Sequence, residues 1–125
     1  MRAAEHELVP LTALLVQAFY GYTPPSTVRG YALLEHGEPI IVMGLRRTHL
    51  GWLAFSDAKE EARARRETFA MRRLVILCTR QFLELLRQTK APVLAMANER
   101  FSGACELLER LGFERLEEGG YRWQA

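Results

Sequence analysis

The densest group of side chains that could bind a charged ligand is a short run of arginines near the middle of the chain. Arg63, Arg65 and Arg66 lie almost side by side in the sequence. A guanidinium is a planar fork of N–H donors, so it can bind a phosphate through two hydrogen bonds at once. The alternative is a solvated helix face, because Glu61 has the i,i+4 spacing for an ion pair with Arg65. The sequence leaves both interpretations open.

The histidines and cysteines show no spacing typical of a metal site or a nucleophilic triad. His6, His36 and His49 are scattered along the chain, and no Ser-His-Asp or Cys-His order stands out. Cys78 and Cys105 each fall within an apolar helical pattern, which favours reduced packing residues over a disulfide or a metal pair. We therefore expect no metal ion.

Composition indicates one globular domain over residues 1–125. Hydrophobic residues make up 49% and charged residues 26%, which is ordinary for a domain that forms its own core. No run approaches the roughly 18 apolar residues that span a bilayer, and the N-terminus lacks the apolar core of a signal peptide. We expect a cytoplasmic protein without membrane contact. A net charge of +2 does not argue for nucleic acid as a partner.

Apolar spacing in the first half of the chain predicts one helix followed by three strands. The helical pattern begins at Pro10 and ends at Gly21. A tight turn at His36-Gly37 separates the first two strands, and the short connections make all three strands antiparallel. The strands are expected at residues 28–35, 39–45 and 50–55.

The second half of the chain has the pattern of a crossover unit. A short helix or turn is expected over 58–66 and a main helix over 68–89. The main helix is apolar around most of its circumference, so it should be covered on more than one side. The apolar run 92–97 predicts a buried strand parallel to the 50–55 strand. A helix over 102–111, a turn at Gly112 and a hairpin of 115–117 with 121–123 complete the chain. Predicted core residues are Leu74, Phe82, Leu111 and Phe113, with Trp52 and Trp123 in core or edge packing.

Four short segments, in this order, resemble the GCN5-related N-acetyltransferase (GNAT) superfamily over nearly the whole chain. They are the turn at Gly37, Ile40–Gly44, the strand from Trp52 to Ser56-Asp57, and Leu111-Gly112-Phe113. The stretch EHGEPIIVMGLRRTHLGWLAFSDA, with the Arg-rich helix after it, looks most like small GNAT-like proteins of tailed phages and prophages, some of them internal virion proteins. The resemblance implies an α/β fold, an α+β sandwich with a mixed, mostly antiparallel sheet and helices on both faces.

The GNAT resemblance also implies acetyl-CoA as cofactor, bound beside the third strand. Working enzymes of the superfamily hold its pyrophosphate on the backbone N–H groups of a glycine-rich loop. Here no glycine lies between Gly51 and Gly103, so arginine side chains would have to replace that loop. The cofactor-binding residues expected on this basis are Phe55, Ser56, Arg63, Arg65, Arg66 and Asn98.

Catalytic groups are implied by the same resemblance. A carboxylate near the third strand would deprotonate the acceptor amine, and the candidates are Asp57 and Glu35. The alternatives are a helix cap for Asp57 and a surface position for Glu35. Leu108 occupies the place of the tyrosine that usually protonates the thiolate, and it has no proton to donate. Cys105, one turn earlier, is a poor substitute and is expected in the core.

Two functions follow from these observations. One is an acyl-CoA-dependent N-acetyltransferase with a degenerate phosphate-binding loop. The other is a catalytically inactive phage or prophage module that binds a phage or host protein, or takes part in virion assembly, and would then be associated with the virion. A CoA-type ligand belongs to the first and a protein partner to the second, and a homodimer is compatible with both.

Overall fold

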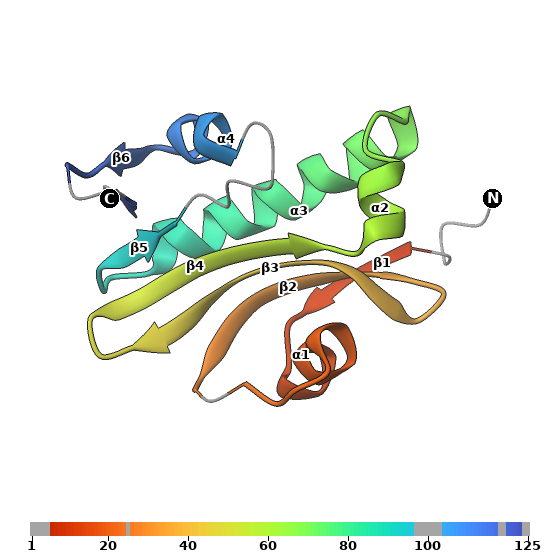
Figure 1. The fold of residues 1–125 in the computed structure, drawn as a ribbon, viewed down its shortest axis with the longest axis horizontal. Helices are drawn as coiled ribbons and strands as arrows, with labels where there is room; N and C mark the ends of the chain where they lie inside the picture. The colour runs from red at the N-terminus through yellow and green to blue at the C-terminus, as the bar shows by residue number, and fades with distance from the viewer. Residues whose placement is uncertain (1–5, 25, 97–103, 118–119, 124–125) are drawn as a thin grey trace.

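The structure is a computed structural model that describes residues 6–24, 26–96, 104–117 and 120–123, with side chains in the last helix described from Leu108 onward. Within these residues, seven strands form one sheet and four helices pack against it (Figure 1). The strands are β1 (His6–Pro10), β2 (Val28–Glu35), β3 (Glu38–Thr48), β4 (Gly51–Ala58), β5 (Val93–Ala95), β6 (Phe113–Arg115) and β7 (Tyr121–Trp123). The helices are α1 (Ala13–Tyr20), α2 (Glu60–Ala64), α3 (Phe69–Gln88) and α4 (Ala104–Leu111).

The sheet is mixed and mostly antiparallel, as predicted. Its strand order is β1-β2-β3-β4-β5-β7-β6. Only β4 and β5 are parallel neighbours, with Trp52–Ala54 opposite Val93–Ala95, and every other neighbouring pair is antiparallel. The helix α3 connects these two parallel strands, so the predicted crossover unit is confirmed.

The β2–β3 hairpin forms at the predicted turn. His36 has φ 51° and Gly37 has φ 82°, which is the pair of positive φ values that a two-residue type I′ turn requires. Glu35 and Glu38 face each other across this turn. β2 has its predicted bounds, whereas β3 extends past residue 45 because Arg46–Thr48 pair with β4.

The N-terminal segment departs from its prediction. Residues His6–Pro10 form the strand β1 beside β2, and the helix α1 starts at Ala13, after Thr12 accepts a hydrogen bond from the Leu15 N–H at 3.2 Å. Pro10 therefore ends a strand and does not begin the helix. A proline lacks the N–H of the ladder but is tolerated at the edge of a sheet, and β1 is an edge strand.

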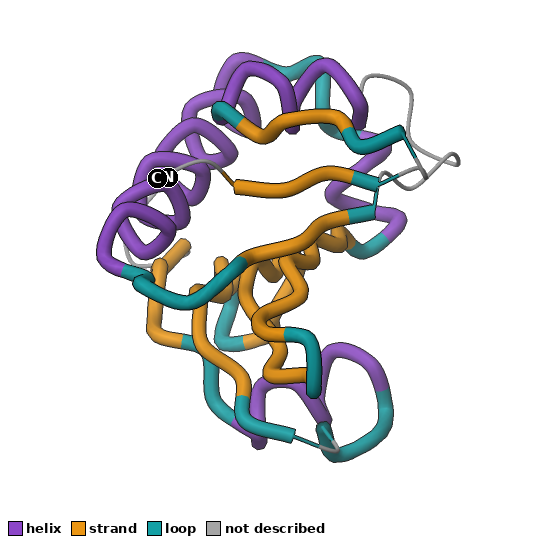
Figure 2. The backbone as a smooth tube through the Cα atoms, turned by 90° about the vertical axis from the view of Figure 1, so that its left-hand side faces the viewer, coloured by secondary structure: helices purple, strands orange, loops and turns teal. Residues whose placement is uncertain are grey.

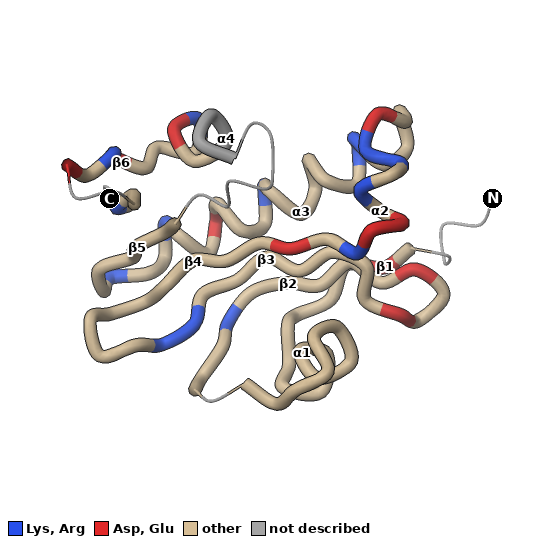
Figure 3. The backbone as a smooth tube through the Cα atoms, viewed as in Figure 1, with Lys and Arg blue, Asp and Glu red and all other residues tan. Residues whose placement is uncertain are grey.

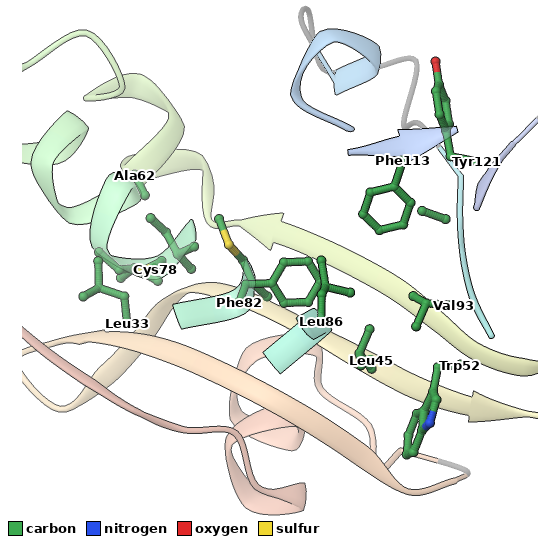
Figure 4. Close-up of a cluster of buried hydrophobic side chains, with 14 of the residues drawn as sticks. Leu33, Leu45, Trp52, Ala62, Cys78, Phe82, Leu86, Val93, Phe113 and Tyr121 are labelled. Carbon is green, nitrogen blue, oxygen red and sulfur yellow. The ribbon is translucent and has the colours of Figure 1, made fainter. Parts of the chain in front are cut away.

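Helices cover both faces of the sheet (Figure 2). On one face α1 packs Val16 and Phe19 onto Ala32 and Val42, which we call the α1-side core. The other face carries the larger core beneath α3, shown in Figure 4, which we call the α3-side core. Phe82, Phe113 and Trp52 are buried in it as predicted, while Leu74, Leu111 and Trp123 pack at its margin.

Helix α3 begins where predicted but is less covered than predicted. Thr68 caps it by accepting a hydrogen bond from the Met71 N–H at 3.2 Å. Phe69, Ile76 and Leu77 are half exposed or more, because the sheet covers one side of the helix only. Cys78 is buried, and this burial raises the pKa of its thiol to about 11, consistent with a packing residue.

The first strand of the C-terminal hairpin begins two residues before its prediction, while the second lies at the predicted residues 121–123. The strand β6 begins directly after Gly112, at Phe113, and not at residue 115. Gly112 has φ 104°, so it occupies the left-handed conformation expected just after a helix end. That turn lets Phe113 enter the α3-side core at the first position of the strand.

Candidate functional site

The last residues of β4 extend beyond the described pairing with β5. The pairing with β5 ends at Ala54, while β4 continues to Ala58 and stays paired with β3. In the described part of the chain no strand pairs with Phe55–Ala58 on the β5 side. Phe55 and Ser56 alternate across the sheet: Phe55 packs against the α1-side core and Ser56 is exposed.

Asp57 lies in β4 and is bound by a tyrosine. The Tyr20 hydroxyl, at the end of α1, donates a short hydrogen bond to the Asp57 carboxylate. Burial, and then this hydrogen bond, raise the pKa of Tyr20 well above its usual value, so the phenol remains the donor. The helix-cap interpretation of Asp57 is wrong, because α2 starts after Lys59 and no side chain caps it. Asp57 instead joins β4 to α1.

Lys59, two residues after Asp57 in sequence, also contacts the C-terminal end of α1. Its ammonium donates a hydrogen bond to the Phe19 carbonyl at 2.5 Å and lies 4.6 Å from the centroid of the Phe19 ring. A cation is favoured there, because the carbonyls at a helix C-terminus carry partial negative charge. Sequence reasoning missed Tyr20 and Lys59, since neither belongs to a motif. The fold alone brings them next to Asp57.

Glu35 is held by an arginine and a histidine. Both of its oxygens accept hydrogen bonds from the Arg65 guanidinium, at 2.8 and 2.9 Å, and the His6 imidazole lies 2.7 Å from Oε2. The Arg65 hydrogen bonds are the main cause that lowers the pKa of Glu35 to about 2. Such a carboxylate accepts a proton poorly at neutral pH, so the role of general base does not suit it. Glu35, Arg65 and His6 form a cluster that we call the Glu35 cluster.

The three arginines do not converge on one ligand position. Arg65 is bound to Glu35. The predicted ion pair between Arg65 and the Glu61 carboxylate is wrong, because the part of Glu61 that Arg65 contacts is its backbone carbonyl, at 3.3 Å. Arg66 lies 3.7 Å from the Glu67 carboxylate. Arg63 lies half-buried in α2. A shared phosphate site built from these side chains would require Arg65 to leave Glu35.

The backbone after β4 is also engaged. The N–H groups of residues 63, 65, 66 and 68 donate to carbonyls three or four residues earlier, at 2.9–3.2 Å, and the Lys59 N–H donates to the Ile40 carbonyl at 2.8 Å. A phosphate cradle needs several neighbouring N–H groups that point away from the chain. This segment is wound into α2 and a following turn, so it does not fit the pyrophosphate of acetyl-CoA.

Of Leu108, Asn98 and Cys105, the structure describes the side chain of Leu108. Leu108 is half-buried and packs against the α3-side core. Asn98 and the side chain of Cys105 lie outside the described residues. The described residues hold no group of three or more His, Cys, Asp or Glu side chains that could bind a metal ion. None of the described helices has both the length and the apolar character of a membrane span.

A second group of polar side chains lies at the opposite end of the sheet and was not anticipated as a site. The guanidinium carbons of Arg29 and Arg47 each lie 5.3 Å from the centroid of the Trp52 ring. Arg47 and Trp52 are direct partners across β3 and β4, and Arg29 comes from β2. The spacing Arg47–Trp52 across a four-residue turn was the available signal. We call these three residues the arginine–tryptophan group.

Comparison with known proteins gave no family: no protein-family model, curated protein or solved structure matches the chain. Arguments about function therefore rest on the geometry of the two ends of the sheet. One end carries the Glu35 cluster and the Asp57–Tyr20 pair, and the other carries the arginine–tryptophan group. Figure 3 shows both signs of charge mixed near α2, and only basic residues on β2 and β3 near the β3–β4 turn.

Proposed function

We propose that this chain is a GNAT-like domain that works as a binding module and not as an acetyltransferase. The observation that carries the proposal is the use of the segment after β4. Arg65 and the backbone N–H groups of residues 63, 65, 66 and 68 are bonded within the chain, where an enzyme of the superfamily needs such donors for its cofactor. The partner of such a module would be a protein of the phage or the host.

The GNAT-like part of the proposal is supported by strand arrangement. A helix-connected parallel pair inside an otherwise antiparallel sheet, β4 beside β5, is the arrangement the resemblance implies. The final hairpin pairs β7 with β5, so the C-terminus is built into the sheet and not appended to it. Fold similarity does not by itself decide activity, which is why the occupied donors carry the functional argument.

The binding-module part is supported by the two candidate bases. Glu35 has a pKa lowered to about 2 and is bound by Arg65 and His6. Asp57 already accepts a hydrogen bond from Tyr20. General acid help is also lacking at Leu108, and such help typically accounts for about 10²–10⁴ in rate. Each group that the reaction needs is therefore either engaged or of the wrong type.

Calorimetric titration with acetyl-CoA and with CoA tests the proposal directly. We expect no saturable binding below millimolar concentrations, because about two missing charge-assisted hydrogen bonds weaken binding by about two to four orders of magnitude. Thiol release from acetyl-CoA in the presence of small amines should stay at the rate without protein. Submicromolar binding or amine-dependent turnover would overturn the proposal.

An impaired acetyltransferase is the second candidate, and the Asp57–Tyr20 pair favours it. A partly buried carboxylate in β4, beyond the described pairing with β5 and hydrogen-bonded to a tyrosine, has the composition of an acid–base site. The discriminating variant is Leu108→Tyr, which restores a phenol at the place of the usual acid. In an impaired enzyme it raises turnover, whereas in a binding module turnover stays at background.

A further inference from the structure

The arginine–tryptophan group is built on a fixed platform. Trp52 is only 8% exposed, and Figure 4 shows it at the end of the α3-side core with Leu45 and Val93. Its backbone N–H donates to the Pro92 carbonyl at 2.9 Å, which fixes the strand end. A guanidinium over the face of an indole is attracted by the ring and loses conformational freedom. The ring therefore holds both guanidinium groups in place before any ligand arrives.

Arg29 and Arg47 contact an aromatic ring, as Arg73 does at Phe69, and they are the two described arginines that share one ring. Arg65 and Arg72 each bind a carboxylate, and so do Arg87 and Arg122. In the described residues no carboxylate lies within ion-pair distance of Arg29 or Arg47, and both side chains are exposed. Two cations that share one ring repel each other. An anion bound by these guanidinium groups would offset that repulsion with attractive contacts.

We propose that the arginine–tryptophan group binds the carboxylates of an acidic segment in a partner protein. This inference rests on the proposed binding function and names the chemistry of the partner. Guanidinium forks match carboxylates in a bidentate manner, and Leu50, 64% exposed in the adjoining turn, adds an apolar contact. A mixed apolar and cationic surface is typical of contacts between proteins, in which arginine is enriched.

Nucleic acid is the less favoured ligand of the same charge. Proteins that bind single strands offer exposed aromatic rings on which bases stack. Trp52 is buried and its ring is covered by guanidinium groups, so it offers no stacking face. A phosphodiester would use the charges alone, while an acidic peptide can use the charges and the exposed side chain of Leu50.

The test is a titration of the ¹⁵N-labelled full chain with two probes of equal charge. One probe is an acetylated and amidated octapeptide of alternating Asp and Glu, and the other is a nine-nucleotide oligothymidylate. The observed signals are the indole N–H of Trp52 and the side-chain N–H groups of Arg29 and Arg47. The indole signal is assigned with Trp123→Phe, which leaves one tryptophan. We expect saturable shifts with the peptide and weaker shifts with the oligonucleotide.

Three variants separate a built site from diffuse charge. Arg29→Gln and Arg47→Gln should each weaken peptide binding by about ten-fold, since each removes one charge-assisted fork. Arg46→Gln is the matched control, because Arg46 neighbours Arg47 but lies on the opposite face of β3; it should change the affinity less than about two-fold. Arg47→Lys keeps the charge, removes the fork and should recover only part of the affinity.

Several results would overturn the proposal. Equal losses in all three glutamine variants, or shifts that leave the Trp52 indole unchanged, would overturn the proposal in favour of general electrostatic attraction. Tighter binding of oligothymidylate would overturn it in favour of nucleic acid. Should one glutamine variant not fold, the other lies on a different strand and gives the same reading. Turnover of acetyl-CoA would refute the proposed function and leave this titration interpretable by itself.

Discussion

The two ends of the sheet treat their charges in opposite ways. At the end near α2, Glu35 is matched by Arg65 and His6, and Asp57 by Tyr20. At the other end Arg29 and Arg47 lie on the same indole with no carboxylate nearby in the described part of the chain. Opposite charges in contact stabilise a fold, whereas two like charges near one ring repel each other, and a bound anion relieves that repulsion. We therefore propose a structural role for the first end and a binding role for the second.

The contacts at the end of the sheet near α2 join segments that are remote in sequence. The Glu35 cluster links β1, the β2–β3 hairpin and the segment after α2, which are remote in sequence. The Tyr20–Asp57 bond links α1 to β4 in the same region. These contacts thus join five parts of the chain. We infer that this end was given over to stability.

The largest loss of stability is expected from a change at Trp52, the ring that Arg29 and Arg47 contact. Trp52→Ala removes a buried ring from the α3-side core and should lower the free energy of unfolding by about 3–5 kcal/mol. Urea denaturation measures this value, and Leu50→Ala, two residues away and exposed, is the control that should change it by less than about 0.5 kcal/mol. A loss below about 1 kcal/mol would mean that Trp52 is not a core residue and that the arginines lack a fixed platform.

At the paired end, Glu35→Gln should lower the free energy of unfolding by about 1–2 kcal/mol. The variant leaves Arg65 and His6 without their anion, and the effect is moderate because Arg65 is partly exposed and screened by solvent. Glu38→Gln is the matched control on the same hairpin, since Glu38 is exposed. Equal stability of both variants would show that the Glu35 cluster contributes nothing to the fold.

Low pH should remove the contribution of the Glu35 cluster to stability. The pKa of Glu35 is about 2 in the folded chain against 4.5 for an ordinary glutamate, so the folded state favours the ionised form. Its contribution is complete above about pH 4.5 and is lost as the pH falls towards 2. The difference in unfolding free energy between the wild type and Glu35→Gln should therefore shrink over this window. A difference that stays constant from pH 7 to about pH 2 would contradict the ion pair.

Tyr20→Phe should cost about 1 kcal/mol of unfolding free energy. The change removes the hydroxyl donor and leaves the partly buried Asp57 carboxylate with one hydrogen bond fewer. Tyr22→Phe is the control, because Tyr22 is exposed while its ring lies 5.6 Å from that of Tyr20. If both variants unfold at the same urea concentration as the wild type, the hydroxyl has no structural role and the acid–base interpretation of the pair gains support.

Most of the sheet could be predicted because its signals are local. The His36-Gly37 turn specified the hairpin, and the apolar run before residue 97 specified the buried parallel strand. The strand β1 was missed because its five residues include Glu7 and Pro10 and show no clear alternation. Its stability comes from pairing with β2, a partner about 25 residues away that no local pattern reveals.

The site was harder to predict than the fold, because it depends on which residues meet. Glu61 was a plausible partner for Arg65 by helical spacing, but Glu35 lies 30 residues away in sequence and accepts both hydrogen bonds. A surface helix pair of that type contributes only a few tenths of a kcal/mol, so a bidentate partner on another element prevails. Asp57 was likewise expected at a helix start, and the actual helix begins after Lys59.

The smallest effect on stability is expected where the effect on binding is expected to be largest. Arg29→Gln or Arg47→Gln removes one cation–π contact, which contributes about 0.5–1 kcal/mol at exposed sites, and also relieves the repulsion between the two guanidinium groups. These terms oppose each other, so unfolding free energy should change by less than about 0.5 kcal/mol.

Arg65→Gln, with the same charge change at the paired end, should cost about 1–2 kcal/mol. Urea denaturation of the three variants at low and high salt gives the comparison, and salt should stabilise the wild type relative to Arg29→Gln by screening the repulsion. If Arg29→Gln costs as much as Arg65→Gln, the arginine–tryptophan group is a structural element like the Glu35 cluster, and the distinction between the two ends of the sheet fails.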